Sequence, residues 1–128
     1  MRKILFRGKG NKKYNDGGWY YGVPIQCDDG DWQICTNCSK RTVAAETIGQ
    51  YTGLNDKNGT KIFEGDIVKC ISRFDAKDMV VIFETAEFHL VDCQRYKNYT
   101  ECCGYRHFGT LETEVIGNIH DNPELLRG

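Results

Sequence analysis

The sequence lacks long hydrophobic runs and has only two prolines in 128 residues. Its longest unbroken apolar stretch, Met79–Phe83, is far shorter than the ~20 residues that a membrane-spanning helix requires. The apolar stretch near the N-terminus stops after Ile4–Phe6, so we predict no secretory signal peptide and expect a cytoplasmic location. With 40% hydrophobic and 12% aromatic residues, the composition excludes a disordered, fibrous or membrane-embedded chain. We therefore expect a soluble globular protein with a packed core and no membrane partner.

The sequence also lacks the motifs of common enzyme classes. It contains no phosphate-binding glycine loop, no dinucleotide fingerprint and no serine nucleophile elbow. The histidines His89, His107 and His120 can each pair with a cysteine in principle, but a strand position such as His89 is typical of a half-exposed sheet residue. We predict a protein without catalytic activity, and a cysteine- or zinc-dependent enzyme is an alternative.

The formal net charge of −1 gives no overall attraction to nucleic acid or membranes. The charge is uneven, because residues 1–13 contain basic residues and no acidic one. Such a basic arm can contact phosphates, and the predicted nucleic-acid site combines three of its residues with a nearby aromatic: Arg2, Lys3, Arg7 and Trp19. The favoured interpretation is different. It places the basic residues at a solvated sheet edge and the aromatic residues in a core or subunit interface.

Seven cysteines are unusually many for this length, and without a signal peptide their thiols are expected to stay reduced. Cys35 and Cys38 form a C-x-x-C pair, whose sulfurs can hold one metal ion from a tight turn. A zinc site needs four ligands, and the set that we consider adds Cys27 and Cys102. Other residues able to complete it are Cys103 and His107. Because no second C-x-x-C motif is present, free thiols in turns and core are favoured, and no cofactor is expected.

The first half of the chain shows the composition of short strands. We predict strands over Lys3–Gly8, Trp19–Ile25 and Trp32–Cys35, with a hairpin between the last two. Pro24 should confine its strand to an edge or to a strand end, because proline has no backbone N–H. Val43–Ile48 is too short for periodicity to distinguish a strand from a helical turn.

The second half gives a clearer pattern. Asn58-Gly59 favours a tight turn between the strands Tyr51–Leu54 and Lys61–Phe63. Four more strands are expected, the middle two joined by a turn at Thr85-Ala86: Ile67–Ile71, Met79–Phe83, Glu87–Asp92 and Glu114–Ile119. Strands at this spacing predict a mainly β protein, a small barrel or sandwich, in which some helix is allowed. Exposed strand edges and many aromatic residues favour a homo-oligomer.

Three parts of the chain carry a family resemblance. The centre combines Ile48-Gly49-Gln50-Tyr51-Thr52-Gly53-Leu54, Asp56-Lys57-Asn58-Gly59 and Ile62-Phe63-Glu64-Gly65-Asp66-Ile67-Val68. The tail reads Glu114-Val115-Ile116-Gly117-Asn118-Ile119-His120-Asp121-Asn122-Pro123-Glu124-Leu125. The opening has Arg7 after a short apolar strand, and Trp19 follows later before a glycine. Together these segments resemble the YopX family, whereas the cysteines around Cys35 and Cys102 are not part of its pattern.

The resemblance implies a small protein that is encoded by bacteriophages and prophages and acts in the cytoplasm of the bacterial host. It also implies a mostly β fold whose C-terminal half is an SH3-like barrel. We accordingly expect a strand-rich region over residues 1–50, with the basic arm and the C-x-x-C pair, before an SH3-like region over residues 51–128. The two regions can form one continuous domain. The family has no established activity, so no catalytic residue follows from the resemblance.

The function that we predict is a non-enzymatic binding module for a host or phage macromolecule, with protein as the expected partner. Nucleic acid bound by the basic N-terminal arm is the alternative. Within the family motif, four glycines are expected at positive φ or at close backbone approaches: Gly53, Gly59, Gly65 and Gly117. The motif is therefore interpreted mainly as a folding motif. Its exposed candidates for partner binding are Gln50, Asp56, Lys57 and Asp66.

Overall fold

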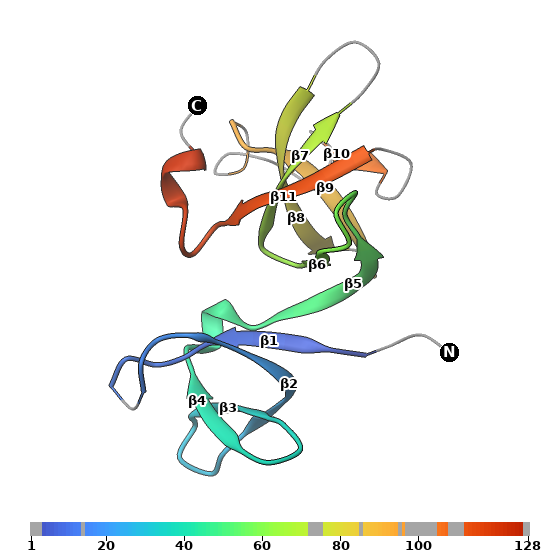
Figure 1. Cartoon of the computed structure of the whole chain (residues 1–128). Helices are drawn as coiled ribbons and strands as arrows, with labels where there is room; N and C mark the ends of the chain where they lie inside the picture. Colours follow the sequence, from blue (N-terminus) through green and yellow to red (C-terminus); the bar gives the residue numbers. More distant parts are fainter. Residues whose placement is uncertain are drawn as a thin grey trace. The chain divides into compact units, whose positions relative to one another are not determined.

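The chain forms two compact units, Met1–Gly53 (unit 1) and Leu54–Gly128 (unit 2). The computed structural model describes residues 4–13, 15–71, 76–84, 86–94, 96, 105–107 and 112–126 (Figure 1). Antiparallel strands make up most of the described residues, so the predicted mainly β class is confirmed. Within the described ranges, no helix has the length and apolar character needed to cross a membrane.

Unit 1 is built from short antiparallel strands. The strands are β1 (Phe6–Lys9), β2 (Trp19–Gln26), β3 (Trp32–Cys35), β4 (Lys40–Val43) and β5 (Gly49–Asn55). A short 3₁₀ turn, η1 (Ala45–Thr47), precedes β5. The sheet order is β4-β3-β2-β1-β5, and β6 (Lys61–Phe63) follows β5. Strands β1 to β4 thus form a meander, and β5 pairs with β1.

The inner face of unit 1 is small. Ile34 and Val43 are buried there, with 0% and 3% of their surface exposed. Gly8 and Gly22 line the same face, where a Cβ at Gly8 would lie 2.9 Å from Val43 Cγ2 and one at Gly22 would overlap the carbonyl oxygen of Cys35. A bridge between Gly10 and Val43 brings the end of β4 back beside the end of β1. The sheet is therefore curled too tightly for larger side chains at these two positions.

Unit 2 is built on a second antiparallel sheet. Its strands are β7 (Asp66–Ile71), β8 (Ala76–Glu84), β9 (Glu87–Asp92), β10 (Tyr105–His107) and β11 (Glu112–Asn118), in the order β10-β9-β8-β7-β11. Successive side chains point to opposite faces, and here both faces are buried. One face carries Val68, Cys70, Met79, Val81 and Leu90, and Ile62 of β6 packs in the same cluster. The other carries Ile67, Val80, Ile82, Val91, Cys93 and Leu126, the last from the C-terminal 3₁₀ turn η3 (Pro123–Leu126).

The predicted turn chemistry is confirmed. Gly59 has φ +83 in the β5–β6 turn, a left-handed conformation that glycine adopts without steric strain. Pairing of Glu84 with Glu87 joins β8 and β9 in the predicted hairpin. Ala86 in the connection has φ 63, whereas Thr85 lies outside the described residues. The other glycines of the motif also behave as expected, two by positive φ and one by a close approach to Asn122: Gly53, Gly65 and Gly117.

Three features differ from the prediction or refine it. The strands β4 and β10 were not predicted, and Val43–Ile48 is divided between the end of β4 and the turn η1. Pro24 lies in β2, which has neighbours on both sides, β1 and β3. However, β1 pairs only with Trp19–Gly22 and β3 only with Val23–Gln26. At the level of Pro24 the strand has a single neighbour, so the predicted edge position is confirmed locally.

Candidate functional site

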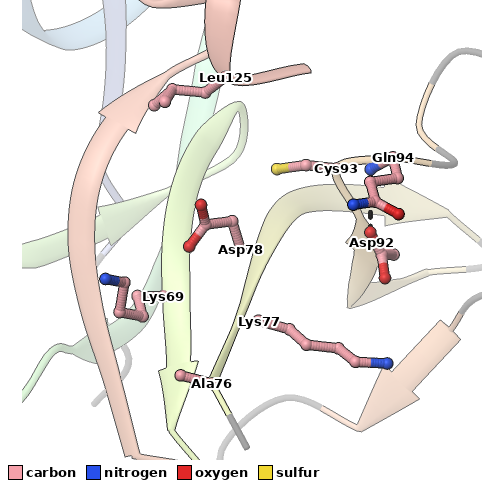
Figure 2. A pocket seen from close by; sticks show the side chains of 8 residues that line it. All are labelled: Lys69, Ala76, Lys77, Asp78, Asp92, Cys93, Gln94 and Leu125. Atoms are coloured by element: carbon pink, nitrogen blue, oxygen red, sulfur yellow. Dashed lines mark hydrogen bonds between the residues drawn. The ribbon is translucent and has the colours of Figure 1, made fainter. Parts of the chain in front are cut away.

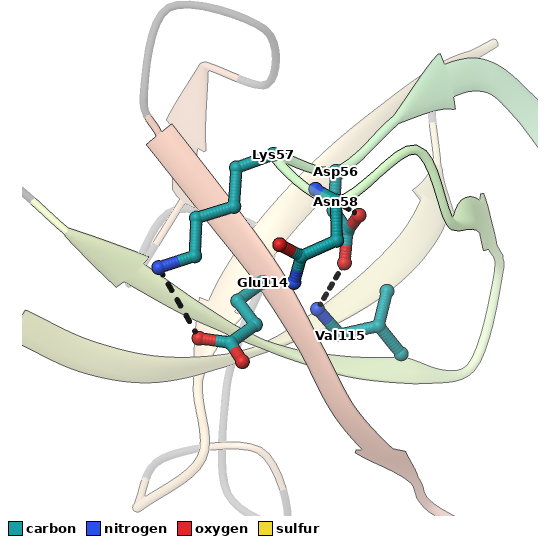
Figure 3. A network of polar contacts seen from close by, with 5 residues as sticks. All are labelled: Asp56, Lys57, Asn58, Glu114 and Val115. Carbon is teal, nitrogen blue, oxygen red and sulfur yellow. Dashed lines mark hydrogen bonds and ion pairs between the residues drawn. The ribbon is translucent and has the colours of Figure 1, made fainter.

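Asp56, a predicted partner-binding residue, joins the β5–β6 turn to strand β11 (Figure 3). Its Oδ1 accepts hydrogen bonds from the N–H groups of Asn58 at 2.8 Å and Thr60 at 2.9 Å. Its Oδ2 accepts the N–H of Val115 at 2.9 Å, from a residue 59 positions away in the sequence. The carboxylate is buried, with 8% of the residue exposed. Asp56 thus accepts a backbone hydrogen bond at the outer edge of β11, where a neighbouring strand would otherwise provide the acceptor.

Lys57 extends this contact. Its backbone N–H donates to the carbonyl oxygen of Thr113 at 3.0 Å, and its Nζ lies 3.5 Å from Glu114 Oε2 in an exposed ion pair (Figure 3). Burial acts to raise the pKa of Asp56, but the three backbone hydrogen bonds, with a smaller contribution from Lys57, outweigh it and lower the pKa below the ordinary value of 3.8. The Asp56 carboxylate is therefore charged at neutral pH, and its hydrogen bonds join the β5–β6 turn to β11.

The other two predicted partner-binding residues lie apart from this network. Asp66 is 1% exposed, and its Oδ2 accepts the N–H of Phe63 at 2.8 Å within the β6–β7 turn. Gln50 is half-buried on β5, opposite Phe6. The expectation that the four side chains are exposed is wrong for Asp56 and Asp66, because each carboxylate turns inward to satisfy backbone N–H groups. A binding role for Gln50 and Lys57 stays a prediction.

Among the described members of the predicted zinc set, the structure does not gather Cys27 with Cys35 and Cys38. Cys35 ends β3 opposite Val23, whereas Cys27 lies beyond the far end of β2. Four residues of strand separate the two levels, which is about 13 Å at ~3.3 Å per residue. Cys38 is exposed in the turn after Cys35. Among the described residues no three His, Cys, Asp or Glu side chains gather as a metal site. Cys102 lies outside those residues, so its part in a zinc site stays a prediction.

The predicted nucleic-acid site is only partly described. Arg7 is buried, at 7% exposure, and its guanidinium carbon lies 4.5 Å from the centroid of the Trp19 ring. A cation stacked on an aromatic ring in this way stabilises the fold and is not directed toward a phosphate. The packing interpretation is therefore favoured for Trp19, and the solvated-edge interpretation is wrong for Arg7, which is buried on β1 between β2 and β5. Arg2 and Lys3 lie outside the described residues, so their role stays a prediction.

Unit 2 contains an open pocket of about 470 Å³ at one end of its sheet (Figure 2). It is lined by Lys69, Ala76, Lys77, Asp78, Asp92, Cys93, Gln94 and Leu125. Cys93 is 3% exposed, and burial, together with Asp78, Asp92 and Cys70, raises the pKa of its thiol to about 12. A thiol with a raised pKa is mostly protonated at neutral pH and is a poor nucleophile. The pocket is lined by both basic and acidic side chains, Lys69 and Lys77 with Asp78 and Asp92.

The surface that sequence reasoning missed is on β2. Tyr21, Val23 and Ile25, here called the β2 row, are exposed by 47%, 58% and 36%. They occupy alternate positions, so their side chains point to the face of the sheet opposite Gly22. The alternation was visible in the sequence, but alternation alone does not reveal which face is inside. The sequence feature that could have identified the inner face is Gly22. A glycine between large residues of a strand indicates that another backbone approaches closely on its side of the sheet.

Comparisons with known proteins give a family and a fold. The family model described as YopX protein matches residues 5–127. Among solved structures, the crystal structure of protein EF1440 from Enterococcus faecalis is similar, with a TM-score of 0.55 and 22% sequence identity. The match covers 99% of this chain and 100% of that chain. No curated protein matches the chain. Because the family model spans nearly the whole sequence, this chain belongs to the YopX family.

Proposed function

We propose that the chain is a non-enzymatic binding module that contacts another polypeptide through the β2 row of unit 1. Phage or prophage origin, and action in the cytoplasm of the bacterial host, are part of the proposal because family resemblance implies them. The expected partner is therefore a phage or host protein.

The β2 row is the observation that carries this proposal. Tyr21, Val23 and Ile25 present apolar surface to water from alternate positions of a single strand. Burial of such surface contributes roughly 25 cal/mol per Å², and tyrosine is enriched at protein interfaces. Clustered exposed apolar side chains of this kind mark interaction sites, whereas isolated ones do not.

The polar groups of the family motif favour a scaffold role. Asp56 and Asp66 are engaged by backbone N–H groups of their own turns and of β11. These contacts fix the path of the chain and leave the carboxylates little capacity for substrate chemistry. The motif therefore supports a stable frame that carries a binding surface.

Affinity capture from lysate of infected host cells tests the proposal. We expect the tagged full chain to retain a polypeptide after nuclease treatment, and Val23→Asp to lose it. Leu54→Asp is the matched control, because Leu54 is exposed by a similar 40% but lies on β5. Retention by Val23→Asp would overturn the proposal, and loss of all partners on nuclease treatment would favour the nucleic-acid alternative.

A further inference from the structure

The β2 row is too small to bind a partner alone. Three side chains cover only part of the roughly 800 Å² that each partner buries in a standard protein interface. A stable contact must therefore extend along β2 to the segments at its two ends. The chemistry of these end segments then decides which partner fits.

The segment after β2 is acidic. The turn that leads to β3 contains Asp28, Asp29 and Asp31 and no basic residue. Asp28 and Asp29 are exposed, and Asp29 Oδ1 accepts the N–H of Asp31 at 2.9 Å. The far end of β2, beyond Ile25, thus carries concentrated negative charge.

The segment before β2 is mainly basic. Lys9 on β1 pairs with Trp19 at the start of β2, and Lys12 and Lys13 are exposed in the loop between the two strands. The same loop contains Asp16, whose Oδ1 accepts hydrogen bonds from the Tyr20 hydroxyl and the Gly18 N–H. The β2 row therefore lies between a basic end and an acidic end of one strand.

We propose that a second copy of this chain covers the β2 row in a two-fold symmetric dimer. This inference rests on the proposed function, since it names the partner of the same surface. The two-fold axis lies between the two sheets, perpendicular to β2 at the level of Val23, so the two β2 strands pack face to face and antiparallel. Val23 of one copy then meets Val23 of the other, and Tyr21 meets Ile25. Each acidic turn faces the basic end of the other copy.

The charges at the two ends of β2 favour the antiparallel arrangement over the other face-to-face packing with two-fold symmetry. An axis parallel to β2 would instead bring acidic turn against acidic turn, and like charges in close contact are strongly disfavoured. Lys40 is the basic residue on β4 at the level of Val23. Because β4 lies two strands from β2, Lys40 lies at the rim of the proposed contact, where its long side chain reaches solvent. A surface that is complementary to itself in this way is the requirement for an isologous dimer.

Sedimentation equilibrium of the purified full chain tests the inference. We expect a dimer at micromolar concentration that Val23→Asp weakens by at least about 100-fold, because two unpaired charges then enter an apolar contact. Leu54→Asp should dimerise like the wild type. Circular dichroism and thermal melting of each variant establish that it is folded.

A charge exchange provides the sharper test. Asp28→Lys with Asp29→Lys makes both ends of β2 basic, and Lys12→Glu with Lys13→Glu makes both ends acidic. Each double variant should dimerise about 10-fold more weakly than the wild type, and a mixture of the two should restore pairing between them. High salt should reduce both effects. Absence of pairing in the mixture would overturn the charge-guided arrangement.

The inference and the proposed function fail in different ways. A wild-type chain that stays monomeric at high micromolar concentration would overturn the dimer. If Val23→Asp then still loses a polypeptide from lysate, the proposed function stands with a different partner. A wild-type dimer that Val23→Asp leaves intact would overturn the inference as well, because the contact would lie elsewhere.

Discussion

The two units use their apolar residues differently. In unit 2 both faces of the sheet are buried, by the two groups of side chains that include Leu90 and Val80. In unit 1 the inner face is small and lined by glycines, and Tyr21, Val23 and Ile25 remain outside. The apolar side chains of unit 2 therefore form a core, whereas three of those in unit 1 stay at the surface, where we propose that a partner binds.

The largest effect should come from the core of unit 2. Leu90→Ala removes a fully buried side chain and leaves a cavity, so we expect the free energy of unfolding to fall by about 3 kcal/mol. Val23→Ala on the β2 row should change it by less than about 0.5 kcal/mol, measured at a concentration where the chain is monomeric. Urea denaturation measures both. Equal losses for the two variants would break the comparison, because they would place Val23 in a core.

The next effect concerns the carboxylate that holds β11. Asp56→Ala leaves the N–H groups of Asn58, Thr60 and Val115 without their acceptor, and we expect a loss of about 2–3 kcal/mol. Lys57→Ala is the control, because the exposed ion pair with Glu114 contributes less than about 1 kcal/mol. If the lysine variant lost as much stability as the aspartate variant, the ion pair and not the buried carboxylate would join the turn to β11.

Much of the fold could be predicted from local sequence patterns. The strands Trp32–Cys35, Lys61–Phe63 and Glu87–Asp92 were predicted with the observed bounds, because alternation or turn residues delimit each of them. By contrast, β4 has only one apolar residue, Val43, and β10 is three residues long. Such strands are defined by pairing with their neighbours and carry little pattern of their own.

The candidate site was harder to predict than the fold. Asp56 and Asp66 are charged residues in turns, and such residues are usually exposed. Their burial depends on backbone donors that tertiary structure supplies, above all Val115 from the far end of the chain. The inward or outward direction of Val23 likewise depends on which face of a curled sheet is closed. A single sequence contains the alternation but not the curvature.

The backbone hydrogen bonds that Asp56 accepts also predict a response to acid. Its pKa is lower in the folded protein than the ordinary value of 3.8, so its stabilising effect is present above that value and is lost as the pH falls through the folded pKa. Asp56→Asn should be less stable than the wild type at neutral pH, and the difference should shrink below pH 3.8. Urea midpoints across this range measure it. A difference that is independent of pH would mean that charge on Asp56 does not stabilise unit 2.

The smallest expected effect on stability comes from two turns of unit 2. Ala86 has φ 63, a conformation that is strained for a residue with a Cβ, whereas Gly59 meets the same demand with glycine. We expect Ala86→Gly to stabilise the protein by about 0.5–1 kcal/mol and Gly59→Ala to destabilise it by a similar amount. Each value is the backbone strain of alanine at positive φ, reduced by the larger conformational entropy that glycine has in the unfolded chain. Thermal melting detects shifts of opposite sign. If Ala86→Gly were instead destabilising, the alanine side chain would contribute to the stability of this turn.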